Sequence, residues 1–339
     1  MKFSIAATDF SNMGTILSRF AAKEAADGFG YVEITIFDGI ARFRTSNPEQ
    51  TATVDYLVDS SKDGTVVIEA SRFLKLAKAF SGIVTIELKG ETLYIKQGKS
   101  KYALQTMGNP HLLALSAIDE LPVKVNFRDA LNKMAFSIDT SADNCMGYYW
   151  FDGKVIAASN QFTLCEATLN VDTGLHSCVP PSAIKDIKGE VEFRQNGKQI
   201  DISYGNFYLS SRLVEYPFPP YRKIIPEHEN YISINRNGLM EILKRISIQT
   251  DTGSVLVSVC DSELLIKTTT DIGSGDESLS GTVNKEFEVE VTLNIKYITS
   301  ALSAVGGETV QLYFGNSAQP VIVKSSEQND FFTLIMPMR

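Results

Sequence analysis

The sequence predicts an α+β protein made of three similar units, because one order of strands, helices and glycines recurs three times in 339 residues. Glycines separated by eight residues form three ladders, at Gly82, Gly90 and Gly98, at Gly189, Gly197 and Gly205, and at Gly307 and Gly315. Each ladder follows an amphipathic helical pattern and contains two short alternating strands. The alternative is a chance spacing of glycines in a mixed protein.

Each unit is expected to begin with a short strand and a first helix. The strands are predicted at 2–7, 123–126 and 231–234, and the helices at 10–26, 127–137 and 235–247. Asp9 or Ser11 is the expected N-cap of the first helix. Second helices are predicted at 70–80, 181–188 and 294–304, close to the first glycine of each ladder, which would provide a left-handed cap.

Alternating apolar residues within each ladder predict hairpin strands. They are Val84, Ile86, Leu88, Leu93 and Ile95 in the first unit, Val191, Phe193, Ile200 and Ile202 in the second, and Val310, Leu312, Phe314, Val321 and Val323 in the third. Asn196-Gly197 is a hairpin-turn signal. By contrast, we expect 273–276 to be a flexible acidic loop.

The repeat predicts three domains, at residues 1–118, 119–228 and 229–339. Apolar residues at both alternations of 331–336 predict a last strand that is buried on both faces. Pro337 ends that strand because it has no N–H to donate. The residues at its tip either stay with their own domain or form an adaptable apolar wall for a protein partner, since methionine repacks against varied ligands.

Composition and motifs exclude several classes of protein. With 44% hydrophobic residues and no apolar run long enough to span a membrane, the chain is expected to be cytoplasmic, with no membrane partner. Four cysteines lack CxxC spacing and three histidines are scattered, so we predict no zinc or paired redox site. Phosphate-loop, HExxH and GxSxG motifs are absent. We therefore expect a protein that is not an enzyme and uses no cofactor.

Charge is distributed unevenly between the predicted helices and the rest of the chain. The six helices hold 13 Lys and Arg against 4 Asp and Glu, a net charge of +9. The remainder holds 19 basic and 36 acidic residues, a net charge of −17, and the whole chain carries −8. If the helices share one surface, that surface attracts phosphate while the outside repels it. The alternative is that lysine simply favours helix surfaces.

Three stretches resemble one known family. The ending Leu334-Ile335-Met336-Pro337-Met338-Arg339, the segment 218–226 and the stretch 293–297 resemble the bacterial sliding clamp, the beta subunit of DNA polymerase III. The resemblance implies three DNA-clamp domains, each with two helices packed on antiparallel sheets. It also implies a head-to-tail homodimer that closes into a ring around duplex DNA without reading its sequence. DNA polymerase and the clamp loader would bind through short linear motifs.

The resemblance also implies a groove for partner peptides between the second and third domains. Its residues would be Trp150, Leu164, Pro219, Lys223, Ile224, Leu334, Ile335, Met336, Pro337, Met338 and Arg339. One wall departs from the family, which usually has Thr-Asp-Gly-His-Arg-Leu where this chain has Ser-Asn-Gln-Phe-Thr-Leu at 159–164. Trp150 stands where leucine is common. These differences indicate a divergent member and leave its peptide preference open.

Two further sets of residues follow from the resemblance. Those expected to face DNA are Arg19, Lys23, Arg72, Lys75, Lys78, Arg128, Lys133, Tyr148, Tyr149, Lys185, Lys188, Arg236, Lys244, Arg245 and Lys296. Those expected at the dimer interface are Lys96, Lys99, Lys101, Tyr102 and Leu104 of one subunit and Ile246, Ile248, Asp276 and Glu277 of the other. Plain packing of the tyrosines, and edge-strand protection by the three lysines, are the alternatives.

Two other functions remain open on the sequence alone. One is a monomeric or open clamp-like interaction module that does not encircle DNA. The other is an unrecognised hydrolase or sugar-binding β protein, which would need a carboxylate-lined pocket that no sequence pattern indicates.

Overall fold

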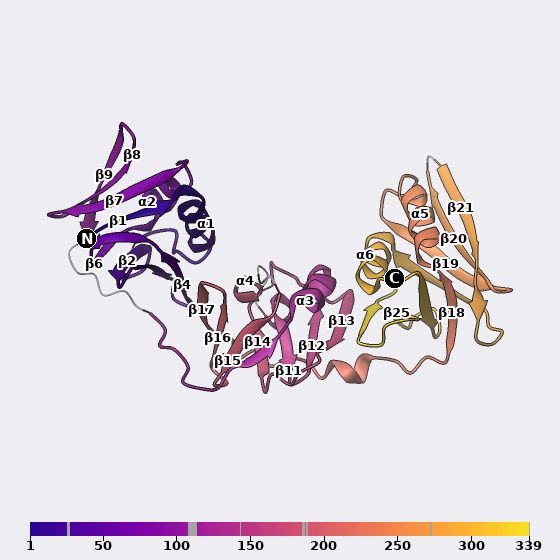
Figure 1. The fold of residues 1–339 in the computed structure, drawn as a ribbon. Helices are drawn as coiled ribbons and strands as arrows, with labels where there is room; N and C mark the ends of the chain where they lie inside the picture. The colour runs from indigo at the N-terminus through magenta and orange to yellow at the C-terminus, as the bar shows by residue number, and fades with distance from the viewer. Residues whose placement is uncertain are drawn as a thin grey trace. The chain divides into compact units, whose positions relative to one another are not determined.

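The computed structural model describes residues 1–25, 28–107, 114–142, 144–184, 187, 189–271 and 273–338. Contacts divide the chain into two compact units, Met1–Val125 with Glu190–Leu213, and Asn126–Gly189 with Val214–Arg339. Each unit is a layer of antiparallel sheet with helices packed on it (Figure 1). The predicted α+β class is therefore confirmed, and the three predicted domains stay a prediction.

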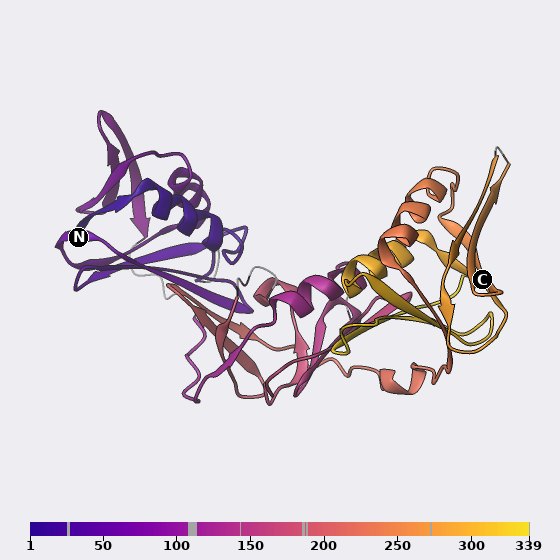
Figure 2. The same ribbon diagram turned by 45° about the vertical axis from the view of Figure 1, so that its right-hand side comes forward.

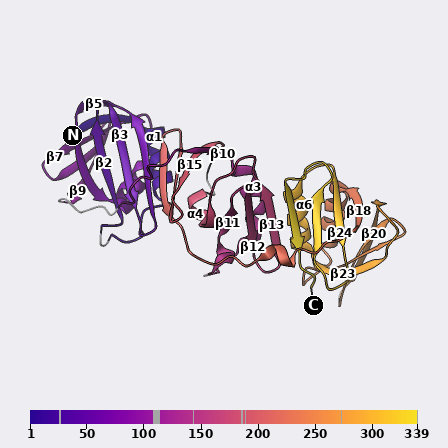
Figure 3. The same ribbon diagram turned by 90° about the horizontal axis from the view of Figure 1, so that it is seen from below.

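The first unit contains one 13-stranded sheet in the order β10-β15-β16-β17-β4-β3-β2-β6-β9-β8-β7-β1-β5. Its strands are β1 (Lys2–Ala6), β2 (Tyr31–Phe37), β3 (Ile40–Ser46), β4 (Gln50–Leu57), β5 (Asp59–Lys62), β6 (Gly64–Glu69), β7 (Ile83–Lys89), β8 (Thr92–Gln97), β9 (Ser100–Met107), β10 (Val123–Val125), β15 (Val191–Gln195), β16 (Gln199–Tyr204) and β17 (Phe207–Arg212). Neighbouring strands such as β2 and β3 run side by side in Figure 3. The sheet continues across the predicted boundary near residue 118, because β17 pairs with β4 from Phe207↔Val54 to Ser211↔Gln50.

Two helices, α1 (Ala7–Leu17) and α2 (Ala70–Ala77), pack together in this unit. A Cβ on Gly14 would lie 3.0 Å from both Ala77 Cβ and the Leu74 carbonyl oxygen, so glycine permits this close approach. Beneath the helices, Phe10 and Phe73 lie edge to face with ring centroids 5.5 Å apart, and both are fully buried. The helix pair is thus fixed to the sheet by an aromatic core.

The first helix starts and ends earlier than predicted, and neither Asp9 nor Ser11 caps it. Ala7 follows β1 directly, and its N–H donates to the Gly82 carbonyl at 2.7 Å, which replaces a capping side chain. The N–H of Arg236 donates in the same way to Glu308 O at 2.9 Å. The equivalent bond at two predicted first helices supports the internal repeat.

The second unit holds a nine-stranded sheet, β14-β11-β12-β13-β26-β25-β24-β18-β22, and a four-stranded sheet, β21-β20-β19-β23. Its strands are β11 (Tyr149–Asp152), β12 (Val155–Ser159), β13 (Thr163–Thr168), β14 (His176–Val179), β18 (Asn230–Asn235), β19 (Ser254–Cys260), β20 (Glu263–Thr270), β21 (Gly273–Ser280), β22 (Thr282–Val283), β23 (Val289–Asn294), β24 (Thr309–Phe314), β25 (Val321–Ser325) and β26 (Phe331–Ile335). Its helices are α3 (Arg128–Met134), α4 (Pro181–Ile184), α5 (Arg236–Ile246) and α6 (Ile295–Val305), with short 3-10 helices η1 (Ala135–Ser137), η2 (Cys145–Gly147) and η3 (Tyr221–Ile224).

Three of these helices lie on one side of the sheets in this unit, where α6 contacts both α3 and α5 (Figure 2). Asn235 and Asn294 cap α5 and α6 by accepting backbone N–H bonds from Gly238 and Lys296. The predicted helices at 127–137, 235–247 and 294–304 are therefore confirmed with small shifts of their ends. Within the predicted helix 181–188, α4 covers Pro181–Ile184, and Lys185 and Lys188 lie outside the described residues.

The predicted hairpins are confirmed, but one predicted loop is wrong. The alternating residues of β7, β8, β15, β16, β24 and β25 face the core, and Asn196-Gly197 forms the turn between β15 and β16, with Gly197 at φ 79°. Residues 273–276, expected to be a loop, begin strand β21, which pairs with β20 along its whole length. A Cβ on Gly275 would lie 2.9 Å from Ile246 Cδ1, so the glycine lets the strand approach α5.

The last strand, β26, is buried on both faces as predicted. It lies between β13 and β25, and Phe331, Thr333, Leu334 and Ile335 are each at most 4% exposed. The strand ends at Ile335, before Pro337. No helix among the described residues has the length and apolar character needed to cross a membrane.

Candidate functional site

An apolar cluster lies on one face of the β11–β12–β13–β26 region. Ala157, Leu164, Tyr221 and Leu334 are its buried members, and Trp150, Phe218, Ile225 and Phe332 pack against it partly exposed. Tyr149 points the other way, because its hydroxyl donates to Leu131 O of α3 at 3.3 Å. Since neighbouring residues of a strand face opposite sides, Trp150 lies on the face away from α3.

A proline-rich segment, Pro217 to Pro226, covers this cluster. Phe218 stacks on Trp150 with ring centroids 5.3 Å apart and planes 7° apart, and it meets Tyr221 edge to face at 5.5 Å. The 3-10 helix η3 follows and leaves Lys223 and Ile224 exposed, with Ile224 at 58%. The segment thus presents an apolar surface continuous with the cluster.

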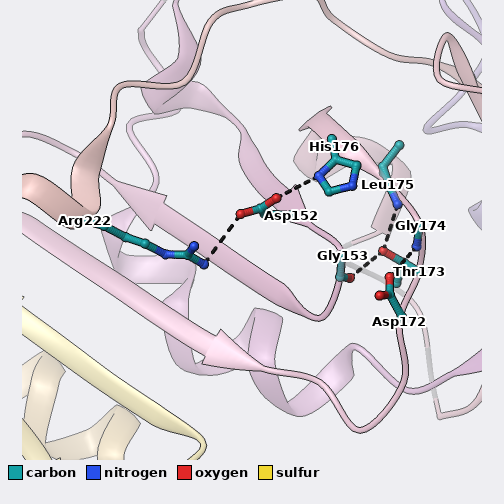
Figure 4. A network of polar contacts seen from close by, with 8 residues as sticks. All are labelled: Asp152, Gly153, Asp172, Thr173, Gly174, Leu175, His176 and Arg222. Carbon is teal, nitrogen blue, oxygen red and sulfur yellow. Dashed lines mark hydrogen bonds and ion pairs between the residues drawn. The ribbon is translucent and has the colours of Figure 1, made fainter.

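Charged side chains attach the same segment to the sheet. The Tyr221 hydroxyl donates to Glu166 at 2.6 Å, and Arg222 lies 3.7 Å from Glu166 and 3.5 Å from Asp152. Figure 4 shows Asp152 between Arg222 and His176, whose Nδ1 is 2.7 Å from the carboxylate. Burial and the bond to Glu166 raise the pKa of Tyr221, so the phenol stays protonated and remains a donor.

The turn before β14 supports His176. Thr173 Oγ1 donates to Gly153 O at 2.8 Å, and the N–H of Gly174 donates to Asp172 Oδ1 at 2.8 Å (Figure 4). Leu175 N–H donates to Thr173 Oγ1 at 3.3 Å. These bonds fix the loop that brings His176 into register with Asp152.

A second apolar surface lies where β26 ends. Met336 N–H donates to Phe162 O and Met338 N–H donates to Thr292 O, both at 2.8 Å, so the backbone after the strand is held in place. The Phe162 ring stacks on Tyr297 at 5.7 Å and is 54% exposed. Met336 and Met338 are 37% and 36% exposed. The side chains of Met336, Met338, Phe162 and Tyr297 therefore provide a solvent-accessible surface that is uncharged.

Among the predicted groove residues, Leu164 and Leu334 form the floor of the cluster and Trp150 covers it. Pro219, Lys223, Ile224, Met336 and Met338 are exposed around it, and Pro337 is half-buried. Ile335 is fully buried among core residues such as Leu239 and Phe314, so its side chain is unavailable to a partner. Arg339 lies outside the described residues. Sequence reasoning did not assign Phe218, Tyr221, Phe162 or Tyr297 to this surface, although all four lie in or beside stretches it had singled out.

The basic residues predicted on the helices fall into two groups. Exposed cations are Arg19, Lys23, Arg72, Lys75, Lys78, Arg128, Lys244 and Lys296, although Arg19 and Lys23 lie beyond the end of α1 and Lys78 follows the last residue of α2. Lys78 also donates to Ser18 Oγ at 2.9 Å. Three further cations are held by partners within the chain. Arg236 donates to Gly307 O and Leu302 O at the end of α6, Lys133 pairs with Asp129 at 2.9 Å, and Arg245 makes a two-bond ion pair with Glu277.

The two predicted DNA-facing tyrosines differ in exposure. Tyr149 is only 3% exposed, so its prediction as a DNA contact is not supported, and burial raises its pKa to about 12. Tyr148 is half-buried, with its ring 5.5 Å from that of Tyr216. Strand β11 begins between them, and its alternation turns Tyr149 inward.

The predicted dimer residues lie on or near one strand in each unit. Lys101, Tyr102 and Leu104 are on β9, and Asp276 and Glu277 are on β21. Lys96 is on β8, Lys99 lies between β8 and β9, Ile246 ends α5 and Ile248 follows it. On β9, residues 100–105 pair with β8, while the pairing with β6 is confined to Thr106 and Met107. Strand β21 pairs only with β20 among the described strands. Tyr102 is 45% exposed and Ile248 79% exposed, whereas Ile246 is buried beneath β21.

Charges on these edges are partly neutralised within the chain. Lys96 lies 2.5 Å from Glu87, and Lys101 lies over the Tyr94 ring at 4.2 Å. Asp276 pairs with Lys267 at 3.2 Å, and Arg245 binds Glu277 and lowers its pKa. These two edges therefore carry less unpaired charge than the sequence suggested. Across the described ranges, no group of three or more His, Cys, Asp or Glu could hold a metal ion.

Residues 222–339 match the family described as DNA polymerase III beta subunit, C-terminal domain. The chain is 21% identical to the beta sliding clamp of Pseudomonas aeruginosa over 313 residues, which cover 84% of each chain. It is 28% identical to the beta sliding clamp of Treponema pallidum over 160 residues, which cover 45% of this chain and 43% of that protein.

Solved structures with the same fold cover the whole chain. The crystal structure of the DNA polymerase III subunit beta from Pseudomonas aeruginosa aligns with a TM-score of 0.88 and 17% identity, over 100% of both chains. That of the Helicobacter pylori beta clamp bound to DNA ligase peptide aligns with a TM-score of 0.88 and 19% identity, again over 100% of both. The arrangement of sheets and helices in each unit is therefore the beta clamp fold.

Proposed function

We propose that this chain, a divergent relative of the bacterial beta sliding clamps, is a processivity factor that tethers DNA polymerase and other replication or repair proteins to duplex DNA. The observation that carries the proposal is the alignment of its fold, over its whole length, with a beta clamp bound to a DNA ligase peptide. The protein has a tethering role and no catalytic one. The three domains would span residues 1–118, 119–228 and 229–339.

Two copies form the ring head to tail. Backbone N–H and C=O groups of β9 that have no strand partner among the described residues meet the corresponding groups on β21 of the other copy, which extends one antiparallel sheet into the next. Exposed Tyr102 and Ile248 provide apolar contact beside this junction. Lys99 and Lys101 add favourable charge opposite the acidic β21, although Asp276 and Glu277 already have partners in their own chain.

The helices face the DNA and hold it weakly. Exposed Arg72 and Lys75 on α2, Lys78 directly after it, Arg128 on α3, Lys244 on α5 and Lys296 on α6 contact phosphates without reading bases. One to three exposed cations per helix suit a ring that slides, because each added phosphate contact raises affinity and salt dependence. A closed ring retains DNA by topology.

Partners insert apolar anchors beside β26. The floor is Leu164 and Leu334, and the walls are the segment from Phe218 to Ile224 and the open surface of Phe162, Tyr297, Met336 and Met338. Burying one aliphatic or aromatic anchor contributes about 1.5–3 kcal/mol, which suits reversible exchange of partners. Polymerase and clamp loader would compete for this surface in the cytoplasm.

Retention on DNA of two shapes tests the function. The labelled protein is loaded on nicked circular DNA by the clamp loader of its host, and the circle is then cut with a restriction enzyme. A sliding ring stays on the intact circle and leaves after the cut, because only a free end releases it. Equal retention on circular and linear DNA would overturn the proposal.

Sedimentation velocity separates the ring from an open module. A species of twice the 37.4 kDa chain mass at micromolar concentration is expected for the homodimer. A 37.4 kDa species that still binds peptide would favour a monomeric interaction module without encirclement.

A further inference from the structure

The segment 217–226, one wall of the proposed groove, cannot be attached to the sheet as a strand. Proline occupies positions 217, 219, 220 and 226, and proline has no N–H for a ladder. The backbone bonds of its turn are local, from Tyr221 N–H to Pro219 O at 2.6 Å and from Lys223 N–H to Pro220 O at 3.0 Å. Side chains must therefore fix the position of this wall.

Two carboxylates on the sheet provide that attachment. Glu166 of β13 is 17% exposed and receives both the Tyr221 hydroxyl, at 2.6 Å, and the Arg222 guanidinium, at 3.7 Å. Asp152, at the end of β11, holds the other side of the guanidinium at 3.5 Å. Arg222 thus bridges carboxylates from two strands, with β12 between them. Figure 4 shows its pairing with Asp152.

The held residues continue directly into the binding surface. Tyr221 is 5% exposed and contacts Phe218 edge to face, and Phe218 stacks on Trp150. On the other side along the chain, Lys223 and Ile224 are the exposed residues of the same 3-10 helix. A shift of Tyr221 would therefore move both Phe218 and Ile224.

We infer that Glu166, with Asp152, is a positioning residue of the partner groove: the two carboxylates hold Tyr221 and Arg222, and so fix the Phe218–Ile224 wall against Trp150. This inference rests on the proposed peptide-binding function. It adds that affinity for a partner depends on ion pairs that the peptide never touches. Because Arg222 is 57% exposed, salt weakens its pairs, and part of the peptide affinity should be lost with them.

The test compares Glu166→Gln, Tyr221→Phe, Arg222→Gln and Arg222→Lys with the wild-type chain. Glu192→Gln is the matched control, since Glu192 lies in the other unit and pairs only at 3.6 Å with Arg194. The probe is a fluorescein-labelled synthetic peptide with one leucine and one phenylalanine anchor, measured by anisotropy at low and high sodium chloride. Trp150 is the single tryptophan of the chain and stacks on Phe218, so its fluorescence emission reports the position of the Phe218–Ile224 wall.

We expect Glu166→Gln and Tyr221→Phe each to weaken peptide binding about fivefold to tenfold, because part of the free energy of a hydrogen bond to a charged group is lost from the bound state. The double variant, Glu166→Gln with Tyr221→Phe, should bind the peptide as tightly as the single variant of lower affinity does. The two substitutions remove the same hydrogen bond, so their effects do not add. Arg222→Lys keeps the positive charge, so it should retain more peptide affinity than Arg222→Gln does. For the same reason, peptide binding should remain more dependent on salt in Arg222→Lys than in Arg222→Gln. Trp150 emission should shift in the weakened variants and not in Glu192→Gln.

Tyr221→Phe removes one oxygen atom and keeps the buried ring, so a folded variant is available even if another fails. Wild-type affinity in both Glu166→Gln and Tyr221→Phe would overturn the inference. If the wild-type chain binds no peptide, the proposed groove fails instead. In that case the Trp150 emission of the variants still shows whether the carboxylates hold the wall. Unchanged emission would overturn the inference that Glu166 and Asp152 position it.

Discussion

Asp201 offers a sharp test of how the first unit is held together. Its carboxylate is fully buried and accepts four bonds, from Ile118 N–H at 2.6 Å, Tyr208 OH at 2.6 Å, Ser210 Oγ at 2.7 Å and Gln199 Nε2 at 2.9 Å. Each carboxylate oxygen accepts two of these bonds. Asp201→Asn replaces one oxygen by an NH₂ group, which faces two donors whichever way the amide is turned.

The expected loss follows from these contacts. Two bonds to a charged acceptor contribute about 1.5–3 kcal/mol each, and part of this returns because the remaining oxygen still accepts two bonds of ordinary strength. We expect the free energy of unfolding of this unit to fall by about 3 kcal/mol. For a unit of this size that lowers Tm by roughly 6–12 °C.

Differential scanning calorimetry measures the change, with the transition of the second unit as an internal reference. Tyr208→Phe removes a single donor and should cost about 1.5 kcal/mol, roughly half as much. Hydrogen exchange at the Ile118 amide should accelerate in Asp201→Asn, since that amide loses its charged acceptor. A shift in Tm below about 1 °C for Asp201→Asn would refute the view that this carboxylate fastens residues 114–120 to the sheet.

Three further predictions concern the surfaces and the core. Removal of 336–339 should abolish peptide binding in an anisotropy assay and leave the dimer intact by sedimentation, and unchanged affinity would refute the placement of the groove. Ile248, 79% exposed in the single chain, is proposed to form an apolar contact in the dimer. Ile248→Glu places a charge in that contact, so sedimentation at micromolar concentration should show a dissociated dimer for this variant and an intact one for Glu192→Gln. Burial raises the pKa of Cys165 from 9.0 to about 11, so the native state binds this proton more tightly than the unfolded chain does. Stability from this thiol is fully present below pH 9 and is lost between about pH 9 and 11, and denaturant titrations should show a shallower pH slope for Cys165→Ala.

Much of the fold could be predicted because its signals are local. The glycine ladders and the hairpin at Asn196-Gly197 depend on backbone conformation and alternation, which a short window of sequence contains. The start of α1 could not be predicted, since its first N–H is satisfied by Gly82, far along the chain. Strand β21 was missed because its glycines and serines have a low strand propensity, and its place depends on the surface of α5.

The candidate site was harder to predict than the fold, because composition gives the number of charged residues and not the direction in which their side chains point. Summed charge placed Arg236 with the other helix cations, but its guanidinium binds the carbonyls at the end of α6. Tyr148 and Tyr149 are neighbours, but Tyr149 is buried and Tyr148 is half-buried. This difference depends on where β11 begins, at Tyr149, and the sequence did not predict that position. The stack of Phe162 on Tyr297 joins residues more than 130 positions apart, and no local pattern contains it.

The position of β26 between β13 and β25 has a consequence for synthesis of the protein. Cys165 and Thr333, neighbours across that pairing, are separated by 168 residues. At the usual rate of translation, β13 waits roughly ten to thirty seconds for its partner to be made. During that time it is an open strand edge next to exposed apolar residues, which other chains can pair with. The edge of β13 is therefore covered, and the proposed docking surface completed, only when the final strand is inserted.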